Sequence, residues 1–455
     1  MLRRLPTLAL LFCLAFAAHA TAAPPAWVAD ATMYQVNLRQ ATAEGTAKAF
    51  GEQHLDRLDK LGVKILWFMP VHPIGELERN GKLGSPYAVR DYKAFNPELG
   101  TLDEFKTLVD DAHERGMHVI LDWVANHTAP DHVWLADHPD WFTRDEAGNT
   151  VFPVPEWQDV IDLDFDKPAM RRAMIDAMKF WVVEASTDGF RCDAAIMVPE
   201  DFWQAAREEL DAIKPLFWLA EAVEPELMAE TFDATYGWHL STNLELIAKG
   251  EKTAEDLKNY LVADERVVPD DGFRLNFTNN HDKNSWECTA KERFGDSLDA
   301  MTVLTFTVPG MPLIYNGQEA GLDKRLAFFE RDPIDWDRDL KAEKLYRNLI
   351  EFKAKHEALS TGHGEASIRF LKSPPGVITF VRSHAGDEVS VVVNCTDEPI
   401  VVDVAMYPGG VDVLASGVML EGFKSNSDGR QPLGQNVKLG AWGYVISAKP
   451  NADEQ

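Results

Sequence analysis

The sequence predicts an α/β protein in which a (β/α)8 barrel is followed by a small all-β domain. Between residues 32 and 330, eight short apolar runs alternate with segments of helical periodicity. After about residue 365, short β-type runs separated by Gly, Pro and Asp replace that pattern. Nearly continuous apolar runs are typical of parallel strands buried on both faces, and their alternation with helices favours a barrel.

The helices between the expected strands have recognisable ends. Thr101 and Glu104 have the spacing of a capping box, and Pro168 suits a first helical turn. Eight strands with crossover helices form a TIM barrel, to which we assign residues 24–365. The expected strands cover residues 33–38, 65–69, 119–124, 189–193, 217–221, 233–236, 274–278 and 312–315.

Two further parts complete the predicted organisation. A short insert after the third strand, residues 127–164, is rich in Trp, His, Pro and Asp, and long connections are usually functional. At least two of its tryptophans are expected to form a small core of the insert. Residues 366–455 are predicted to be a β-sandwich domain. Its expected strands cover residues 368–371, 377–382, 389–394, 401–404 and 442–447.

The net charge and the N-terminal sequence indicate which partners and which cellular compartment to expect. The 455 residues carry a net charge of −28, which disfavours nucleic acid and anionic membranes as partners and suits a neutral substrate. Arg3 and Arg4 precede an apolar run at residues 8–18 and then small residues. This pattern predicts a signal peptide at residues 1–23 and export to the periplasm or the medium. The run is too short to span a membrane.

Three carboxylic acids lie where strands of the barrel end. Asp193 ends the fourth expected strand, Glu221 ends the fifth, and Asp282 follows the seventh. The C-terminal strand ends of a barrel face its active site, and a carboxylate buried there needs partners. Arg191 is two residues before Asp193 and points the same way, so its charge favours the ionised form of Asp193. The apolar run before Glu221 favours its neutral form.

One ionised and one neutral carboxyl group are the nucleophile and the acid of a retaining glycosidase. This assignment predicts a separation of roughly 5–5.5 Å between the two groups. Asp282 is expected to bind sugar hydroxyls, and His127 and His281 to contact the same ring. Alone, an Arg-x-Asp pair on a strand is more often a structural ion pair, but three acids and two histidines at successive strand ends favour a catalytic site.

Several segments resemble the α-amylase family of glycoside hydrolases. Residues 122–127 are similar to its D-x-V-x-N-H motif, residues 189–194 to G-F-R-x-D-A, and residues 277–282 to F-x-x-N-H-D. The resemblance covers about residues 32–330. Further similar segments are residues 62–70, 85–101 and 310–319.

The resemblance implies a double-displacement mechanism in which Asp193 is the nucleophile and Glu221 the acid and base. It makes Tyr87 a platform on which the reacting sugar stacks, and His127, Arg191 and His281 contacts of that sugar. The alternative for Tyr87 is a packed surface tyrosine. The function that the resemblance implies is hydrolysis of α-1,4-glucosidic bonds in starch-type glucans or maltooligosaccharides. The alternatives are an α-glucosidase or a transglycosylase on maltooligosaccharides or, more remotely, a non-catalytic glucan-binding protein.

The chain also departs from the family pattern. Ile196 and Met197 stand where typical members have Lys and His, so the lysine on the leaving-group side is absent. Asn126 and Asp162 match positions that bind calcium in some relatives, and oxygen ligands suit Ca²⁺, the one cofactor that the resemblance suggests. Alternatively, Asn126 forms hydrogen bonds at the base of the insert. Ala194 is typical of members that act on α-1,4 bonds, whereas chain-length preference and oligomeric state stay open.

Overall fold

The structure is a computed structural model that describes residues 23–336, 339–362, 366–403, 412–419 and 436–448. Apart from Ala23, the predicted signal peptide lies outside these residues. Eight parallel strands close into a barrel in the order β1-β10-β9-β8-β7-β6-β3-β2, which confirms the predicted fold class. The barrel strands are β1 (Met33–Val36), β2 (Ile65–Phe68), β3 (His118–Trp123), β6 (Gly189–Cys192), β7 (Phe217–Ala220), β8 (Ala234–Tyr236), β9 (Phe273–Asn276) and β10 (Met311–Tyr315).

Strand β2 explains why the barrel strands are apolar throughout. Its residues are all buried. Ile65 and Trp67 belong to the cluster inside the barrel, whereas Leu66 and Phe68 belong to the larger cluster between the barrel and its helices. Because successive side chains of a strand point to opposite faces, a strand between two cores needs an apolar residue at every position.

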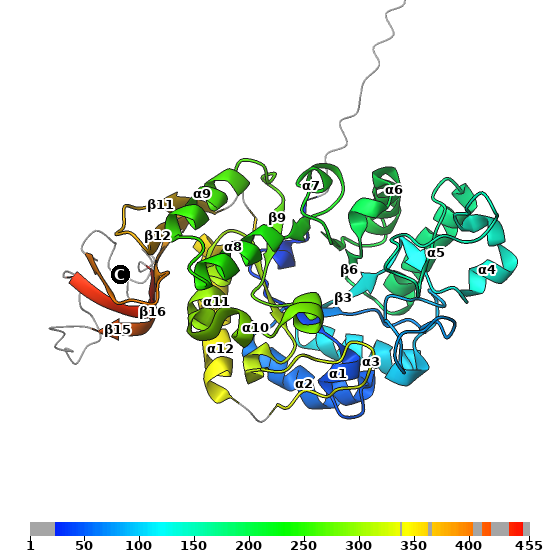
Figure 1. Cartoon of the computed structure of the whole chain (residues 1–455), viewed down its shortest axis with the longest axis horizontal. Helices are drawn as coiled ribbons and strands as arrows, with labels where there is room; N and C mark the ends of the chain where they lie inside the picture. The colour runs from blue at the N-terminus through cyan, green and yellow to red at the C-terminus, as the bar shows by residue number, and fades with distance from the viewer. Residues whose placement is uncertain (1–22, 337–338, 363–365, 404–411, 420–435, 449–455) are drawn as a thin grey trace, which may run out of the picture.

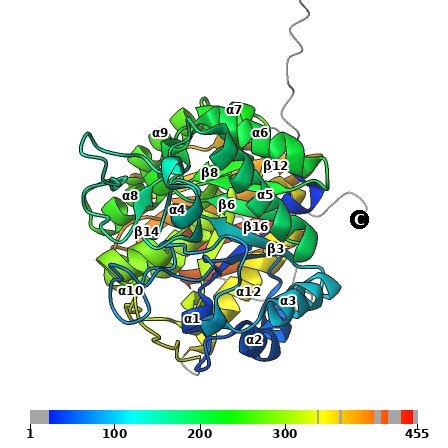
Figure 2. The ribbon, with the colours of Figure 1, turned by 90° about the vertical axis from the view of Figure 1, so that its right-hand side faces the viewer.

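Helices surround the barrel, and Figure 2 shows strands β3, β6 and β8 inside this ring. The capping box of Thr101 and Glu104 is present, and Pro168 lies in the first turn of its helix. Over the residues that the structure describes, no helix is long and apolar enough to cross a membrane. The α-helices are α1 (Leu38–Ala41), α2 (Ala47–Leu61), α3 (Leu102–Glu114), α4 (Val133–Asp137), α5 (Pro168–Glu184), α6 (Glu200–Asp211), α7 (Glu226–Glu230), α8 (Trp238–Ala248), α9 (Ala254–Asp264), α10 (Ala290–Phe294), α11 (Leu298–Thr307) and α12 (Leu340–Lys355).

The insert after β3 is closed at its base by a short antiparallel pair, β4 (His127–Thr128) and β5 (Ile161–Asp162). Trp134 and Trp141 pack edge to face with 5.3 Å between ring centroids, but Trp141 belongs to the large cluster between the barrel and its helices and Trp134 packs against it. The tryptophans therefore extend that core, whereas a separate core of the insert was expected. Trp157 is 37% exposed instead. Helix α4 lies at the end of the molecule opposite the C-terminal sheet (Figure 1).

The C-terminal strands form one antiparallel sheet in the order β11-β12-β13-β16-β14, with β15 also paired to β16. Both faces of the sheet are covered. Val391 belongs to the large cluster shared with the barrel helices, whereas its neighbour Val392 belongs to a separate cluster with Val437. The strands are β11 (Ser367–Phe370), β12 (Val377–His384), β13 (Asp387–Asn394), β14 (Ile400–Asp403), β15 (Asp412–Met419) and β16 (Asn436–Ala448).

Candidate active site

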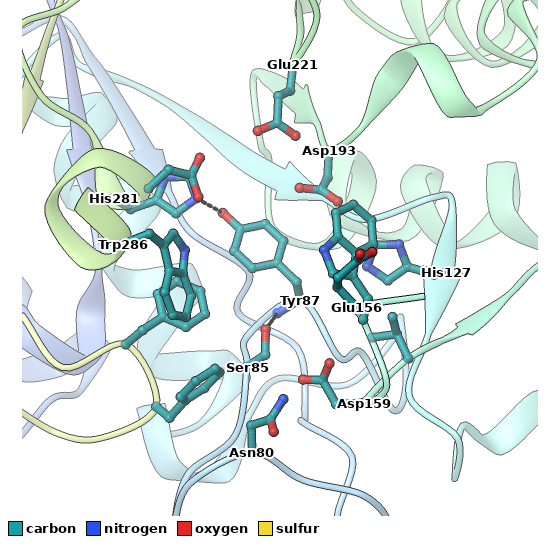
Figure 3. A pocket seen from close by; sticks show the side chains of 15 residues that line it. Asn80, Ser85, Tyr87, His127, Glu156, Asp159, Asp193, Glu221, His281 and Trp286 are labelled. Atoms are coloured by element: carbon teal, nitrogen blue, oxygen red, sulfur yellow. Dashed lines mark hydrogen bonds and ion pairs between the residues drawn. The ribbon is translucent and has the colours of Figure 1, made fainter. Parts of the chain in front are cut away.

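A cavity of about 460 Å³ opens at the C-terminal ends of the barrel strands (Figure 3). It brings together six of the residues predicted from the sequence, which come from five different loops or strand ends. Asn126 and Asp162 do not line it. The lining residues are Asn80, Ser85, Tyr87, His127, Glu156, Trp157, Asp159, Val160, Asp193, Glu221, His281, Asp282, Trp286, Phe328 and Phe329.

Arg191 is fully buried and joins the carboxylates at the base of the cavity. Its Nη1 donates to Asp122 Oδ1 at 2.7 Å and to Asp193 Oδ1 at 2.8 Å. Its Nη2 lies 2.6 Å from Glu221 Oε1, and its Nε donates to the Tyr236 hydroxyl at 2.9 Å. The Arg191–Asp193 contact expected from strand alternation is therefore present, but the guanidinium is shared among three carboxylates.

Asp122 is one of the site residues to which the sequence pattern assigned no role. It lies directly opposite Arg191 in the parallel register of β3 and β6, and it is fully buried. Its Oδ2 accepts hydrogen bonds from Trp67 Nε1 at 3.1 Å and from the Tyr87 hydroxyl at 3.0 Å. A lone aspartate inside an apolar strand was the available signal, because burial of a carboxylate demands partners.

The cavity has more buried carboxyl groups than positive charges to balance them. Burial raises the pKa of Glu221 to about 7 although Arg191 opposes the shift. Burial also raises the pKa of Asp193 and of Asp282, with Arg191 again opposing, and it raises the pKa of Asp122 to about 8. Four carboxyl groups around one guanidinium do not all ionise near neutral pH. The cluster of carboxyl groups therefore retains a proton that an acid catalyst can donate.

A chain of hydrogen bonds fixes Tyr87 and His281. The Tyr87 hydroxyl donates to Asp122 and lies 2.8 Å from His281 Nε2, while His281 Nδ1 lies 2.7 Å from Gln35 Nε2. Gln35 Nε2 can only donate, so Nδ1 accepts and the hydrogen of the neutral ring is assigned to Nε2. Burial lowers the pKa of His281 to about 3, which agrees with a neutral ring. Tyr87 lines the cavity and is not a packed surface residue.

Asp282 and His127 occupy the remaining predicted positions at the cavity. The Asp282 side chain is 33% exposed, and its Oδ1 lies 3.4 Å from His281 Nε2. His127 is buried, which lowers its pKa to about 4, and its ring lies 5.5 Å from the ring of Trp157. Asp282 therefore presents a carboxylate edge to the cavity, while neutral His127 forms part of the opposite wall.

The two predicted calcium ligands lie at the base of the insert. Asn126 Nδ2 lies 3.3 Å from His127 Nδ1, and the backbone carbonyl of Asn126 accepts from the Leu163 amide at 3.2 Å. Ca²⁺ takes roughly six to eight oxygen ligands. Within the described part of the chain, no three His, Cys, Asp or Glu side chains are grouped closely enough to hold a metal ion. The Asn126 contacts support the structural alternative for that residue, and calcium binding by Asn126 and Asp162 stays a prediction.

The family model for the α-amylase catalytic domain matches residues 41–359 of this chain. The chain belongs to the α-amylase family. It is a glycosidase by that membership. This α-amylase family chain is 27% identical over 410 residues to the α-amylase MalA of Haloarcula japonica, an alignment that covers 86% of this chain and 59% of MalA.

Two further relatives of this α-amylase family chain match over most of their length. A cyclomaltodextrinase from Bacillus sp is 29% identical over 432 residues, which cover 82% of this chain and 74% of that protein. The crystal structure of a noncanonic maltogenic α-amylase, AmyB of Thermotoga neapolitana, is 30% identical with a TM-score of 0.79, and the match covers 93% of this chain and 99% of that one.

Proposed function

We propose that the protein hydrolyses α-1,4-glucosidic bonds of starch-type glucans or maltooligosaccharides and retains the anomeric configuration. The observation that carries the proposal is the contact of Arg191 with both Asp193 and Glu221 at the base of the cavity. Two carboxyl groups beside one sugar-sized space are the machinery of a retaining glycosidase. Relatives described as α-amylase and cyclomaltodextrinase support a glucan as the substrate.

In the first step, Glu221 donates its proton to the glycosidic oxygen while Asp193 attacks the anomeric carbon. The bond to the leaving sugar breaks, and an ester between Asp193 and the remaining sugar forms. In the second step, ionised Glu221 takes a proton from water, and the water oxygen displaces Asp193. The raised pKa of Glu221, about 7, supports its role as the acid near neutral pH.

The other residues hold the reacting sugar. The Tyr87 ring packs against the apolar face of the pyranose, and the neutral ring of His281 contacts its hydroxyls. His127 contacts the same sugar from the opposite wall. Asp282 accepts hydrogen bonds from ring hydroxyls and stabilises the positive charge that develops at the anomeric carbon. Arg191 positions Asp193 and Glu221 from below.

Product analysis on maltoheptaose tests this function. Proton NMR during the first minutes should detect the α-anomer of the new reducing ends, because two displacements restore the configuration. Immediate β-anomer would contradict the assignment of Asp193 as nucleophile. A transglycosylase or an α-glucosidase would use the same intermediate, but would yield longer oligosaccharides or single glucose units. Glucan binding without any turnover would favour the non-catalytic alternative.

Export and choice of partners complete the proposal. The basic, apolar and small-residue pattern of residues 1–23 supports removal of a signal peptide and release into the periplasm or the medium. Mass spectrometry of the protein from those fractions should find an N-terminus at or near residue 24. The net charge of −28 repels nucleic acid and anionic membranes but does not repel a neutral glucan, which supports a glucan as the partner.

A further inference from the structure

Gln35 is a fully buried polar side chain to which the proposed reaction gives no role. It lies in β1, opposite Trp67 of β2 on one side and Tyr315 of β10 on the other. It does not line the cavity itself. A buried amide costs free energy unless its oxygen and its NH2 group are both hydrogen-bonded, so its partners indicate what it does there.

The Gln35 side chain binds His281 at two points. Its Oε1 accepts a hydrogen bond from the backbone amide of His281 at 3.2 Å, and its Nε2 lies 2.7 Å from His281 Nδ1. The backbone amide can only donate, so it fixes which end of the Gln35 side-chain amide faces it. The NH2 group is therefore turned toward Nδ1. One rigid amide thus holds both the main chain and the ring of His281.

This arrangement decides which ring nitrogen of His281 carries the hydrogen. Nδ1 accepts from Gln35, so the neutral ring has its hydrogen on Nε2. Nε2 lies 2.8 Å from the Tyr87 hydroxyl (Figure 3) and 3.4 Å from Asp282 Oδ1. His281 therefore presents a donor to the cavity, beside the acceptor oxygens of Asp282. A sugar hydroxyl, which both donates and accepts, is complementary to such a pair.

The order of donors and acceptors continues from His281 to Asp122. The Tyr87 hydroxyl has a single hydrogen, and it accepts from His281 Nε2. Its own hydrogen is therefore donated to Asp122 Oδ2, 3.0 Å away. Every bond in this row points the same way, from the Gln35 amide through His281 and Tyr87 to the Asp122 carboxylate, so each bond strengthens the next.

Asp122 connects this row to the catalytic carboxylates. Its Oδ2 accepts from Trp67 Nε1 at 3.1 Å as well as from Tyr87, and its Oδ1 accepts from Arg191 Nη1 at 2.7 Å. The same Nη1 donates to Asp193 at 2.8 Å. Each neutral donor to Asp122 stabilises its ionised form, so Asp122 depends less on the guanidinium that it shares with the nucleophile.

We propose that Gln35 is a positioning residue for the reaction, which holds His281 in the orientation and tautomer that present Nε2–H to the cavity. Through His281 and Tyr87 it also directs a hydrogen bond to Asp122. The inference rests on the proposed function and adds to it a residue that does not touch the substrate. If Gln35 only supported the fold, its bond to the His281 backbone amide would be sufficient, so the bond to Nδ1 is the one to test.

The tautomer of His281 is the direct test, and it does not depend on activity. Long-range proton–nitrogen NMR spectra of protein that carries isotope-labelled histidine distinguish a ring nitrogen that carries hydrogen from one that does not. The variant His281→Gln identifies the signals of this ring. In the wild type, we expect hydrogen on Nε2 and none on Nδ1. Hydrogen on Nδ1 of the wild-type ring would overturn the proposal.

Gln35→Met keeps the length of the side chain but removes both of its hydrogen bonds. We expect kcat on maltoheptaose to fall about tenfold or more with little change in KM, because a misplaced donor weakens binding of the transition state more than of the ground state. Asn394→Leu is the matched control, since Asn394 is a fully buried amide bonded at both ends in the C-terminal sheet. It should lower the thermal midpoint without a change in kcat. Unchanged kcat in Gln35→Met, or an equal fall in Asn394→Leu, would overturn the proposal.

Gln35→Glu tests the bond to Nδ1 alone, because it keeps the acceptor for the His281 backbone amide. A protonated carboxyl group at this position donates to Nδ1 as Gln35 does, whereas an ionised one only accepts and so requires a hydrogen on Nδ1. Across the pH range, kcat relative to the wild type should therefore be retained where Nδ1 lacks hydrogen and should fall where Nδ1 gains it. Loss of kcat with the wild-type tautomer, or full kcat with hydrogen on Nδ1, would contradict the positioning role.

Failure of the proposed function would give a different result. Wild-type protein that does not cleave maltoheptaose would refute hydrolysis itself, whereas the NMR signals of His281 would still show whether Gln35 sets its tautomer. Hydrolysis by a wild type that carries hydrogen on Nδ1 would leave the function intact and refute the role of Gln35 alone.

Discussion

Strand β6 is flanked by two aspartates whose surroundings are opposite in charge. Asp188, just before the strand, accepts from His113 Nε2 at 2.7 Å, Lys214 Nζ at 2.8 Å and the Val119 amide at 2.8 Å. These partners hold the pKa of Asp188 far below its usual range. Asp193, just after the strand, shares one guanidinium with two other carboxylates, and burial raises its pKa.

The two ends of β6 thus have separate roles, one in stability and the other in catalysis. At the N-terminal end of β6, several donors surround Asp188, so it is ionised at neutral pH and supports the fold. At the C-terminal end, four carboxyl groups share one cationic side chain, Arg191, and burial raises the pKa of each, so they do not all ionise near neutral pH. The same division between stabilising and catalytic ends is general for this architecture. Substitutions at each end, the pH dependence of activity and removal of metal ions test whether the two ends are as distinct as their charges indicate.

Removal of the nucleophile should have the largest effect. Asp193→Asn keeps the size of the side chain but removes the attacking oxygen charge, so kcat on maltoheptaose should fall by about 10⁴-fold or more. Glu221→Gln should lower kcat by about 10² to 10⁴-fold through loss of the proton donor. Unchanged circular dichroism and thermal midpoint would assign the loss to chemistry. Ordinary turnover in either variant would refute the roles of these carboxylates.

The pH profile should reveal the proton held at the catalytic end. Glu221 must be protonated in the first step, so kcat/KM should fall as the pH rises through about 7, up to tenfold per unit. Asp193 must be ionised, so the acid limb should lie above the ordinary aspartate pKa. Because these groups interact, the limbs belong to the cluster as a whole.

An activated substrate provides the control for that profile. With 2,4-dinitrophenyl α-maltoside, the leaving group departs without a proton, so the basic limb should disappear for the first chemical step. Glu221→Gln, which is slow on maltoheptaose, should therefore keep much of the wild-type burst rate on this compound. A basic limb that persists unchanged would point to a group other than Glu221.

The N-terminal end should respond in stability and not in chemistry. Asp188→Asn removes a buried, multiply bonded carboxylate and should lower the free energy of unfolding by about 3 kcal/mol, measured by urea denaturation at pH 7. The folded pKa of Asp188 is depressed, so its contribution is present above the unfolded value of about 4 and is lost as the pH falls below it. The rate of the folded variant should equal that of the wild type.

The smallest effect is expected from removal of metal ions. A bound cation near Asp162 would add positive charge close to His127, and so change the charge balance at the catalytic end. Among the described residues, no three His, Cys, Asp or Glu side chains are grouped so that they could hold a metal ion. Dialysis against EDTA should therefore leave kcat/KM and the thermal midpoint unchanged. A fall in either quantity that Ca²⁺ reverses would establish the metal site that the resemblance suggested.

The sequence was a good guide wherever local pattern and burial agree. All eight barrel strands begin and end close to the expected positions, because a strand between two cores must be apolar at each residue. In the C-terminal domain, β15 was not predicted. Ser416 and Gly417 interrupt its apolar run, so no continuous strand pattern stood out.

Contacts between distant segments were out of reach of local pattern. The hydrogen bond between Gln35 and His281 joins residues 246 positions apart, and the contact of Arg191 with Asp122 depends on the register of two strands. The contacts of the tryptophans in the insert were equally unpredictable from local pattern. Nothing in their spacing indicated that Trp134 and Trp141 pack together while Trp157 faces the cavity.

Local sequence pattern was enough to predict the barrel, the strand ends that carry Asp193, Glu221 and Asp282, and the shared direction of Arg191 and Asp193. These follow from periods of two and 3.6 residues, which act over a few neighbours. Two features could not be predicted from local pattern: how the charge of Arg191 is divided among the carboxylates, and which aromatic rings line the cavity. Both depend on side chains from separate loops that meet only when the barrel closes.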